Sequence, residues 1–395
     1  MLERYIVLRD LASPKDRRDR SMRSADTPVD PGEFQIQTAD LQPGEAMALE
    51  HDDAVSARAP AMPVRLIKPM SVREPGARDV SMAWGLSAVK ADVCERNGRG
   101  IRVAVLDTGI DDTHAAFLPI KDRLVQKDYT GEGNGDTNGH GTHCAGTIFG
   151  SPVDGVRIGI APDISKAYIA KVLGREGGGT SEQIAHAMLW TARMGAQVVS
   201  MSLGLDYPGY VQWLIEKNDL PPALAASHAL VGFRLSVLTF ASIHQTVKLL
   251  VPNCVVMAAT GNESHPEIRP DFKIGASLPA ATQGIVSVGA LARTPAGLTV
   301  ARFSNTGPEV CAPGVDILSA KAGGGLVEMS GTSMATPHVA GVAALWAQQL
   351  EAEGRRPDGA LQRRVIETAS EKGLAPGFRW EDVGSGMVVA PVERK

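Results

Sequence analysis

From residue 84 onward, short apolar runs alternate with longer segments of mixed polarity. Four runs, at residues 101–106, 197–202, 254–259 and 285–291, are rich in valine and other apolar residues. Nearly continuous apolar strands are typical of a parallel sheet that is buried on both faces. Helix-length segments separate these runs, as in chains that alternate strand and helix. The pattern therefore predicts an α/β domain with a buried, mainly parallel sheet.

Three further segments have the pattern or composition of helices. Residues 181–193 are amphipathic, and Ser181 can cap their start. Residues 359–372 predict one more helix. The segment 205–253 contains a pair of prolines followed by a long apolar stretch, and it predicts one or two helices whose ends the sequence does not fix.

The first 80 residues follow a different pattern. Residues 4–9 and 33–38 have the composition and alternation of short strands. Between them, residues 13–30 carry five basic and four acidic side chains, which favours a solvated loop over a site for an anionic partner. Residues 60–80 contain four prolines, which predicts an extended linker.

Composition narrows the classes of function. Of the 395 residues, 44% are apolar, and the net charge is −4. This balance gives no global field that would attract nucleic acid or an anionic membrane surface. The four cysteines, at positions 94, 144, 254 and 311, form no CxxC pair. They predict free, mostly buried thiols rather than a disulfide framework.

No segment has the pattern of a targeting sequence. The longest early apolar run, residues 5–8, is shorter than the ~7–15 residues of a signal-peptide core. Residues 229–243 come closest to a membrane span, but they fall short of the ~20 residues required and include Arg234. The sequence therefore favours a cytoplasmic protein without a membrane partner, with secretion as the alternative.

The first motif with candidate chemistry ends the first apolar run. Asp107 follows that run, and Gly109 permits a sharp turn directly after it. A carboxylate at the end of a buried strand is rigid and partly desolvated, so it can orient an imidazole and stabilise its cation. By itself, an aspartate in this place is more often only a turn former.

The second motif is NGHGTHCAG, in which His140 stands between two glycines. These small neighbours leave its ring free at the start of a helix. His143, three residues later, raises the alternative of a metal site. The zinc-protease motif HExxH requires a four-residue spacing and a glutamate, and the sequence has neither. His143 is therefore interpreted as structural, and Cys144 as a small buried residue rather than a nucleophile.

The third and fourth motifs supply a hydroxyl and an amide. Ser333 is expected at the start of a helix, because Pro337 is tolerated only near a helix beginning. There the hydroxyl lies at the positive end of the helix dipole, and the backbone N–H is free to bind a ligand. Asn262 follows the third apolar run and can donate to an oxygen that gains negative charge. Taken singly, these residues would be a helix cap and a turn residue.

The order aspartate, histidine, serine is more specific than any single motif, because chymotrypsin-like proteases and α/β-hydrolases have other orders. The motifs VAVLDTGID, NGHGTHCAG, SMSLG, ATGN and GTSMATPHVAGVAAL resemble those of the subtilase family of serine peptidases (peptidase S8), over residues 84–390. The cysteine in HCAG is similar to the proteinase-K-like branch. The resemblance implies a subtilisin-like three-layer fold, with a mainly parallel sheet between helices.

The resemblance also implies an endopeptidase mechanism. Ser333 would attack the scissile carbonyl, and His140 would take its proton and pass it to the leaving amine. Asp107 would fix the imidazole. The side chain of Asn262 and the backbone N–H of Ser333 would bind the oxyanion, and an acyl-enzyme intermediate would form.

Two segments resemble the strands that hold an extended polypeptide substrate by backbone pairing. One consists of Ser202, Leu203 and Gly204, and the other runs from Leu173 and Gly174 to Gly178. The resemblance implies no required cofactor. Asp111 matches a position that binds structural calcium in some members, but the loop at 150–157 lacks the expected asparagine.

The resemblance divides the chain into two units. Residues 1–75 take the place of the inhibitory α+β prodomain, and residues 76–395 form the catalytic domain, with an extended insert at about 205–253. The N-terminal unit would be an intramolecular inhibitor, which makes the chain a zymogen that cleaves itself between about Met70 and Val80.

Rival interpretations predict different sequence features. A catalytically silent, subtilase-like binding module requires a broken triad, and an esterase would carry a GxSxG motif. A structural partner protein would act through the insert at 205–253. The sequence has the unbroken triad and GTSMA around Ser333, which favours the endopeptidase.

Overall fold

The computed structural model of the chain describes residues 2–13, 16–17, 30–75, 81–354 and 359–392. In this part of the chain, a central sheet of eight strands has the order β14-β13-β12-β10-β6-β8-β7, and β15 joins it beside β13. Its pairings are parallel except for that of β13 with β14. The strands are β6 (Arg102–Asp107), β7 (Leu124–Asp128), β8 (Lys166–Lys171), β10 (Val198–Met201), β12 (Val255–Ala259), β13 (Val286–Thr294), β14 (Gly297–Val300) and β15 (Val310–Pro313). The four predicted runs are β6, β10, β12 and β13, which confirms the predicted sheet.

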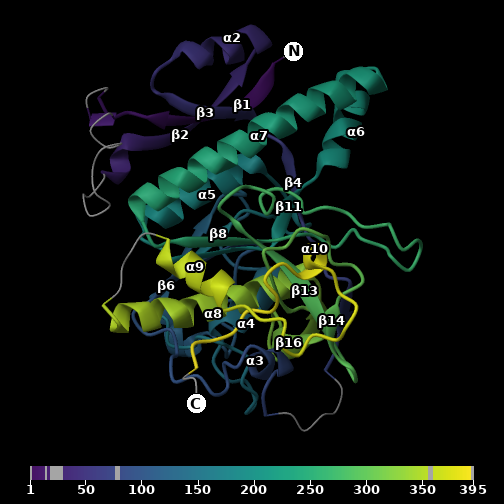
Figure 1. The fold of residues 1–395 in the computed structure, drawn as a ribbon. Helices are drawn as coiled ribbons and strands as arrows, with labels where there is room; N and C mark the ends of the chain where they lie inside the picture. The colour runs from purple at the N-terminus through teal and green to yellow at the C-terminus, as the bar shows by residue number, and fades with distance from the viewer. Residues whose placement is uncertain (1, 14–15, 18–29, 76–80, 355–358, 393–395) are drawn as a thin grey trace.

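Helices cover both faces of the central sheet (Figure 1). Val103 and Val105 of β6 belong to the apolar cluster of α4 (His140–Phe149) and α8 (Thr332–Ala352). The alternate residues, Ala104 and Leu106, belong to the cluster of α5 (Ser181–Arg193) and α7 (Pro222–Leu250). Because successive side chains of a strand point to opposite faces, one apolar strand serves two cores. The fold therefore has the three layers that the resemblance implies.

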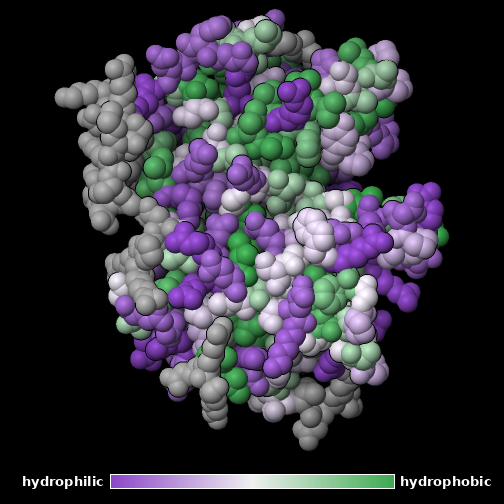
Figure 2. Space-filling view, in the orientation of Figure 1, coloured by the Kyte–Doolittle hydropathy of each residue, from purple (hydrophilic) through white to green (hydrophobic). Residues whose placement is uncertain are grey.

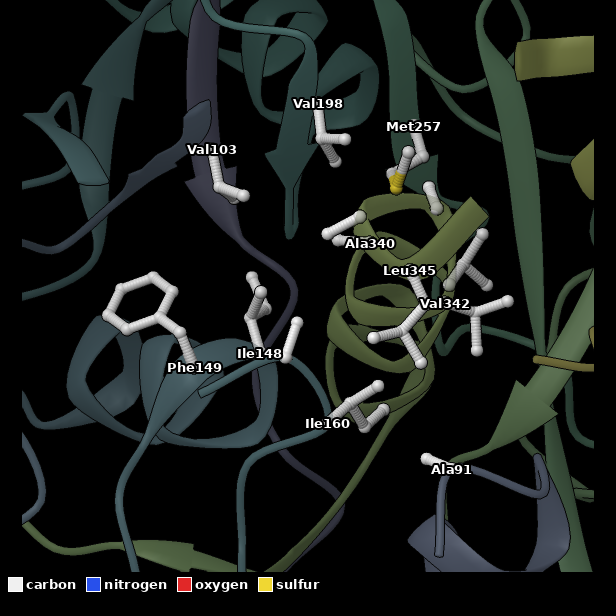
Figure 3. Close-up of a cluster of buried hydrophobic side chains, with 14 of the residues drawn as sticks. Ala91, Val103, Ile148, Phe149, Ile160, Val198, Met257, Ala340, Val342 and Leu345 are labelled. Atoms are coloured by element: carbon white, nitrogen blue, oxygen red, sulfur yellow. The ribbon is translucent and has the colours of Figure 1, made fainter. Parts of the chain in front are cut away.

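The core on the α8 side is close-packed around that helix. Figure 3 shows Val103, Val198 and Met257 of three neighbouring strands beside Ala340 and Leu345 of α8. These side chains are at most 1% exposed. Small residues along α8 let it lie close to the strands, and this packing fixes the position of its N-terminal turn.

The remaining helices are short and lie around these layers. The sequence predicts a helix at 359–372, but α9 ends at Glu367, because the backbone of Ser370 pairs with Met387 in both directions instead. The short helices are α2 (Pro43–Ala48), α3 (Trp84–Ala88), α9 (Ala360–Glu367) and α10 (Trp380–Val383), with 3-10 turns at Pro31–Glu33, Leu49–His51 and Leu118–Arg123.

Helix α5 has the predicted bounds but a different cap. Thr180, not Ser181, is the N-cap, because its hydroxyl accepts from the backbone N–H of Gln183, whose side chain accepts from Thr180 N. The hydroxyl of Ser181 accepts instead from the backbone N–H of Met62, at 2.9 Å. The start of α5 is thereby joined to the N-terminal part of the chain.

The insert forms a helical hairpin of α6 (Tyr207–Asn218) and α7, which is 29 residues long. Among the described helices, α7 alone is long and apolar enough to cross a membrane, judged by length and composition. This helix is longer at both ends than the apolar stretch at 229–243 that the sequence singles out. Its inner face packs on α5 and the N-terminal unit, and Figure 2 shows an apolar patch over its outer side. The large exposed apolar residues of α7 are Leu224, Leu230, Val231, Leu238 and Leu249.

The N-terminal unit is a three-stranded antiparallel sheet of order β2-β1-β3. Its strands are β1 (Glu3–Asp10), β2 (Phe34–Leu41) and β3 (Val55–Pro60). The strands predicted at 4–9 and 33–38 are β1 and the larger part of β2. The sheet packs against α5 and α7 (Figure 1). Most of the charged segment 13–30 lies outside the described residues.

Residues 60–75 are extended, as their prolines predict, but they do not form a free linker. β4 (Pro63–Leu66) lies between β11 (Leu203–Leu205) and β9 (Gly178–Thr180) in an antiparallel sheet. β5 (Ser71–Arg73) pairs with β17 (Leu326–Ser330), which pairs with β16 (Ile317–Ala320). β4 is therefore paired on both sides, and β5 on one side, with strands of residues 178–330.

Candidate active site

Two glycines place Asp107 at the carboxyl end of β6. Gly109 has φ +110°, a conformation that side chains rarely adopt, and a side chain there would meet the carbonyl of Gly135. A side chain at Gly141 in α4 would likewise meet the carbonyl of Gly109. The turn after β6 and the first turn of α4 thus touch backbone to backbone, which brings His140 next to Asp107.

His140 is the first residue of α4, and its Nδ1 lies 2.8 Å from Asp107 Oδ1. Both side chains are at most 1% exposed. Burial by itself lowers the pKa of His140, but the adjacent Asp107 carboxylate raises it, and the net direction is upward. A carboxylate at Nδ1 favours a proton there and leaves Nε2 as the basic nitrogen.

Asp136, which belongs to none of the four motifs singled out in the sequence, organises the motifs of Asp107 and His140. Its carboxylate accepts hydrogen bonds from Thr108 Oγ1 at 2.9 Å and from Thr142 N and Oγ1 at 2.8 and 2.7 Å. Thr108 Oγ1 in turn accepts from Gly141 N at 2.9 Å. Asp136 therefore ties the strand end to the helix start. Its position four residues before His140 in a glycine-rich loop was the available signal.

Ser333 lies in the first turn of α8, with its side chain fully buried. Its Oγ donates to the carbonyl oxygen of Ile67 at 3.0 Å, and Ser202 O lies 3.4 Å away. In the described part of the chain, Nε2 of His140 has no hydrogen-bond partner. The hydroxyl thus points at the backbone that follows β4. The groove between β9 and β11, in which β4 lies, is called the cleft below. The basic nitrogen of His140 is free to accept the proton of the hydroxyl.

The Cys144 sulfur links the two halves of the site. It lies 3.8 Å from His140 Nδ1 and 3.4 Å from the carbonyl oxygen of Ser333. Burial raises the pKa of this thiol, so it remains protonated at neutral pH. A buried neutral thiol is a weak nucleophile. Cys144 therefore packs between the two elements, as the sequence analysis expects.

Asn262 presents an oriented amide to the cleft. Its Oδ1 accepts from the backbone N–H and the hydroxyl of Thr332, both at 2.9 Å. Its Nδ2 donates to the carbonyl oxygen of Lys68 at 3.0 Å. Thr332 thus fixes which side of the amide faces the cleft, and the donor already binds a peptide carbonyl.

The two expected substrate-binding segments lie on either side of β4. Leu203 and Gly204 pair with Leu66 and Arg65, and Gly178 pairs with Arg65 from the other side. Ser202 Oγ donates to the carbonyl of Ser333 at 3.1 Å. Leu173 and Gly174 precede the paired strand: Leu173 is buried, and Gly174 N donates to Gly178 O.

Asp111, the expected calcium position, accepts hydrogen bonds through both carboxylate oxygens. Its Oδ1 accepts from the backbone N–H and hydroxyl of Thr113, and its Oδ2 accepts from Gly323 N at 2.9 Å. Calcium at Asp111 therefore stays a prediction. His143 is also structural: its Nε2 lies 2.9 Å from Ile317 O, and burial lowers its pKa to about 3.

Known proteins are similar to this chain over most of its length. A sequence model of the Subtilase family matches residues 98–385. The chain is 34% identical to "Intracellular serine protease" of Paenibacillus polymyxa over 306 residues, which cover 74% of this chain and 80% of the relative. It is 31% identical to "Alkaline elastase YaB" of Bacillus sp. over 363 residues, 90% of this chain and 78% of the relative. It is 33% identical to "Subtilisin BL" of Lederbergia lenta over 283 residues, 68% and 85% of the two chains.

Proposed function

This chain belongs to the subtilase family, and on that premise we propose that it is a serine endopeptidase with Asp107, His140 and Ser333 as its catalytic triad. The observation that supports this most is the position of Ser333 Oγ, 3.0 Å from the carbonyl oxygen of a peptide that runs through the cleft. A nucleophile must lie close to the carbonyl group whose carbon it attacks.

The proposed reaction begins with rotation of the Ser333 hydroxyl toward the free Nε2 of His140. Nε2 takes the proton as Oγ attacks the carbonyl carbon, and Asp107 stabilises the imidazolium that forms. Asn262 Nδ2 and the backbone N–H of Ser333 bind the oxyanion. The imidazolium then protonates the leaving amine, and water hydrolyses the acyl-enzyme by the same steps in reverse order. Each role falls to a group of this chain, so the proposed reaction requires no cofactor.

The N-terminal unit is proposed to be an intramolecular inhibitor. β4 lies in the cleft as an added antiparallel strand, and β5 continues it past the site. The two catalytic contacts fall on neighbouring carbonyls, since Ser333 Oγ contacts Ile67 O and Asn262 contacts Lys68 O. Neither carbonyl has both the nucleophile and the side-chain oxyanion donor, so attack on this segment is disfavoured while it holds this register.

Self-cleavage is proposed to occur after a shift of this register. The peptide bond nearest to Ser333 is that between Ile67 and Lys68. This bond lies upstream of the stretch from Met70 to Val80 in which the sequence analysis expects cleavage, and residues 76–80 of that stretch lie outside the described residues.

Labelling with a fluorophosphonate probe tests the proposed function. We expect covalent modification of Ser333, located by peptide mass spectrometry, because a serine activated by a general base attacks phosphorus as it attacks a carbonyl. The chain carrying Ser202→Ala, which keeps the triad, should also be labelled. If Ser333 stays unmodified after denaturant has released the N-terminal segment and has been removed, the proposed function is wrong.

Replacing Asn262 with alanine is expected to lower kcat by about 10²–10³-fold with little change in KM, the range found when this donor is removed in a subtilisin. The amide gains most of its binding only when the carbonyl oxygen becomes negative. Thr332→Val serves as the matched control, because it keeps one of the two hydrogen bonds that orient Asn262. Steady-state hydrolysis of a peptide p-nitroanilide measures both variants. Loss through KM alone would contradict the oxyanion role.

A further inference from the structure

The segment that fills the cleft forms further contacts before β4, outside the pairings of β4 with β9 and β11. Met62, the residue before β4, is fully buried. Its backbone N–H donates to Ser181 Oγ at 2.9 Å, and its carbonyl accepts from Ser181 N at 2.9 Å. Hydrogen bonds of the main chain therefore continue past β4 to the backbone and the hydroxyl of Ser181 at the start of α5.

The side chain of Met62 contacts the insert. Ser236 of α7, itself 1% exposed, donates from Oγ to the Met62 sulfur at 3.3 Å. A thioether sulfur is a weak acceptor, so this contact orients the side chain more than it binds it. The larger contribution is burial in the apolar cluster that includes Tyr210 and Phe240 of the insert. An unbranched, flexible methionine suits such an irregular site.

Gly232 of α7 is a second sign that the insert accommodates the segment before β4. A Cβ at this position would lie 3.1 Å from Pro60 Cγ and 3.5 Å from the ring of Tyr210. Glycine weakens a helix interior, so it is expected there only where another group must come close. The group that comes close is Pro60, two residues before Met62. α7 thus contacts this segment at two places, with Gly232 beside Pro60 and Ser236 beside Met62.

We propose that the insert builds an additional substrate site, six residues before the reacting bond, for an unbranched apolar side chain such as methionine. Ile67 is the first residue before that bond, because its carbonyl contacts Ser333, and Met62 is therefore the sixth. This inference rests on the proposed function, since the count starts at the peptide bond nearest to Ser333 in the described register, the one between Ile67 and Lys68. In the structure the chain's own segment fills the site, and in a substrate another polypeptide fills it.

Peptide binding tests this site without depending on catalysis. The probe is a fluorescein-labelled peptide of residues 60–71, titrated with the full chain carrying Ser333→Ala and Met62→Asp. The first change prevents hydrolysis, and the second weakens the chain's own segment as a competitor. We expect the unmodified peptide to bind about 10–100-fold more tightly, by fluorescence anisotropy, than the peptide with Met62→Ala. A peptide with Met70→Ala is the matched control and should bind like the unmodified one, because Met70 is exposed.

Variants of α7 test the protein side of the same contact. Ser236→Leu fills the site, so both peptides should bind with equal affinity. Leu238→Ala, on the exposed side of the same helix, should leave the difference between the peptides unchanged. The chain carrying Ser333→Ala alone should give the same ratio with weaker binding of both peptides, which guards against misfolding of the double variant.

The possible outcomes separate this inference from the proposed function. Equal affinity of the unmodified peptide and the Met62→Ala peptide, or no binding of either one, overturns the inference. Discrimination between the peptides supports it. If the peptides are discriminated but Ser333 is never labelled by the fluorophosphonate, a peptide-binding site stands and the proposed endopeptidase does not.

Discussion

Replacing Ser333 with alanine is expected to lower the turnover of peptide substrates by about 10⁶-fold, the loss found when the nucleophile of a subtilisin is removed. The reason is geometric: in the described structure, Ser333 Oγ is the hydroxyl that lies in the first turn of α8 and contacts a peptide carbonyl in the cleft. Hydrolysis of a short peptide p-nitroanilide, with active protein quantified by probe labelling of the wild type, measures the change.

The same variant tests self-processing through its intact mass. The Ser333→Ala chain is expected to keep the mass of the full chain, 41.6 kDa, while the wild type shortens on incubation. Equal mass patterns of the two chains would contradict self-cleavage. A variant that retains more than a small fraction of wild-type turnover would contradict the assignment of the nucleophile, provided that its circular dichroism spectrum matches that of the wild type.

Replacing Asp107 with asparagine is expected to lower turnover by about 10⁴-fold and to move the acid limb of the pH profile downward. An amide beside Nδ1 can hold the imidazole in the wrong tautomer, which accounts for the loss of turnover. The shift follows from charge. His140 must be neutral to accept a proton, and the Asp107 carboxylate raises its pKa, so wild-type activity is lost as the pH falls through a value above 6.5. Without that carboxylate, burial still lowers the pKa, and the limb moves to lower pH.

The measurement is kcat/KM as a function of pH, which reports the ionisation of the free enzyme. Asp112→Asn is the matched control, because it removes an equal charge near the same strand without contacting His140, and its limb should stay in place. A wild-type limb centred below 6.5 would refute the electrostatic argument even if the variant fails to fold.

The sheet was predictable from the sequence because its strands are apolar on both faces. Val103 and Ala104 belong to different cores, so the whole run must be apolar, and such a run is visible in the sequence. The bounds of α5 were equally visible from its amphipathic period. One or two helices were predicted in the insert, but the bounds of α7 were not visible, because Pro222 is tolerated at a helix start and this helix is apolar on its exposed side as well.

The sequence indicated the reactive residues of the candidate site but not the residue that holds them in place. Asp107, His140 and Asn262 stood out because each follows a buried strand or sits among glycines, where function rather than packing selects the residue. Asp136 did not stand out, because its carboxylate serves backbone and threonine donors that the fold brings together. A residue whose partners are set by tertiary contacts has no local pattern.

The sequence by itself determined the layered α/β architecture and pointed to the candidate reactive side chains, because burial and turn geometry impose patterns within a few neighbouring residues. Tertiary structure alone decided what lies in the cleft. Ile67 and Lys68 reach Ser333 and Asn262 across 266 and 194 positions of the chain. Backbone pairing of β4 with two distant strands puts them there, and main-chain hydrogen bonds place few demands on the residues that form them.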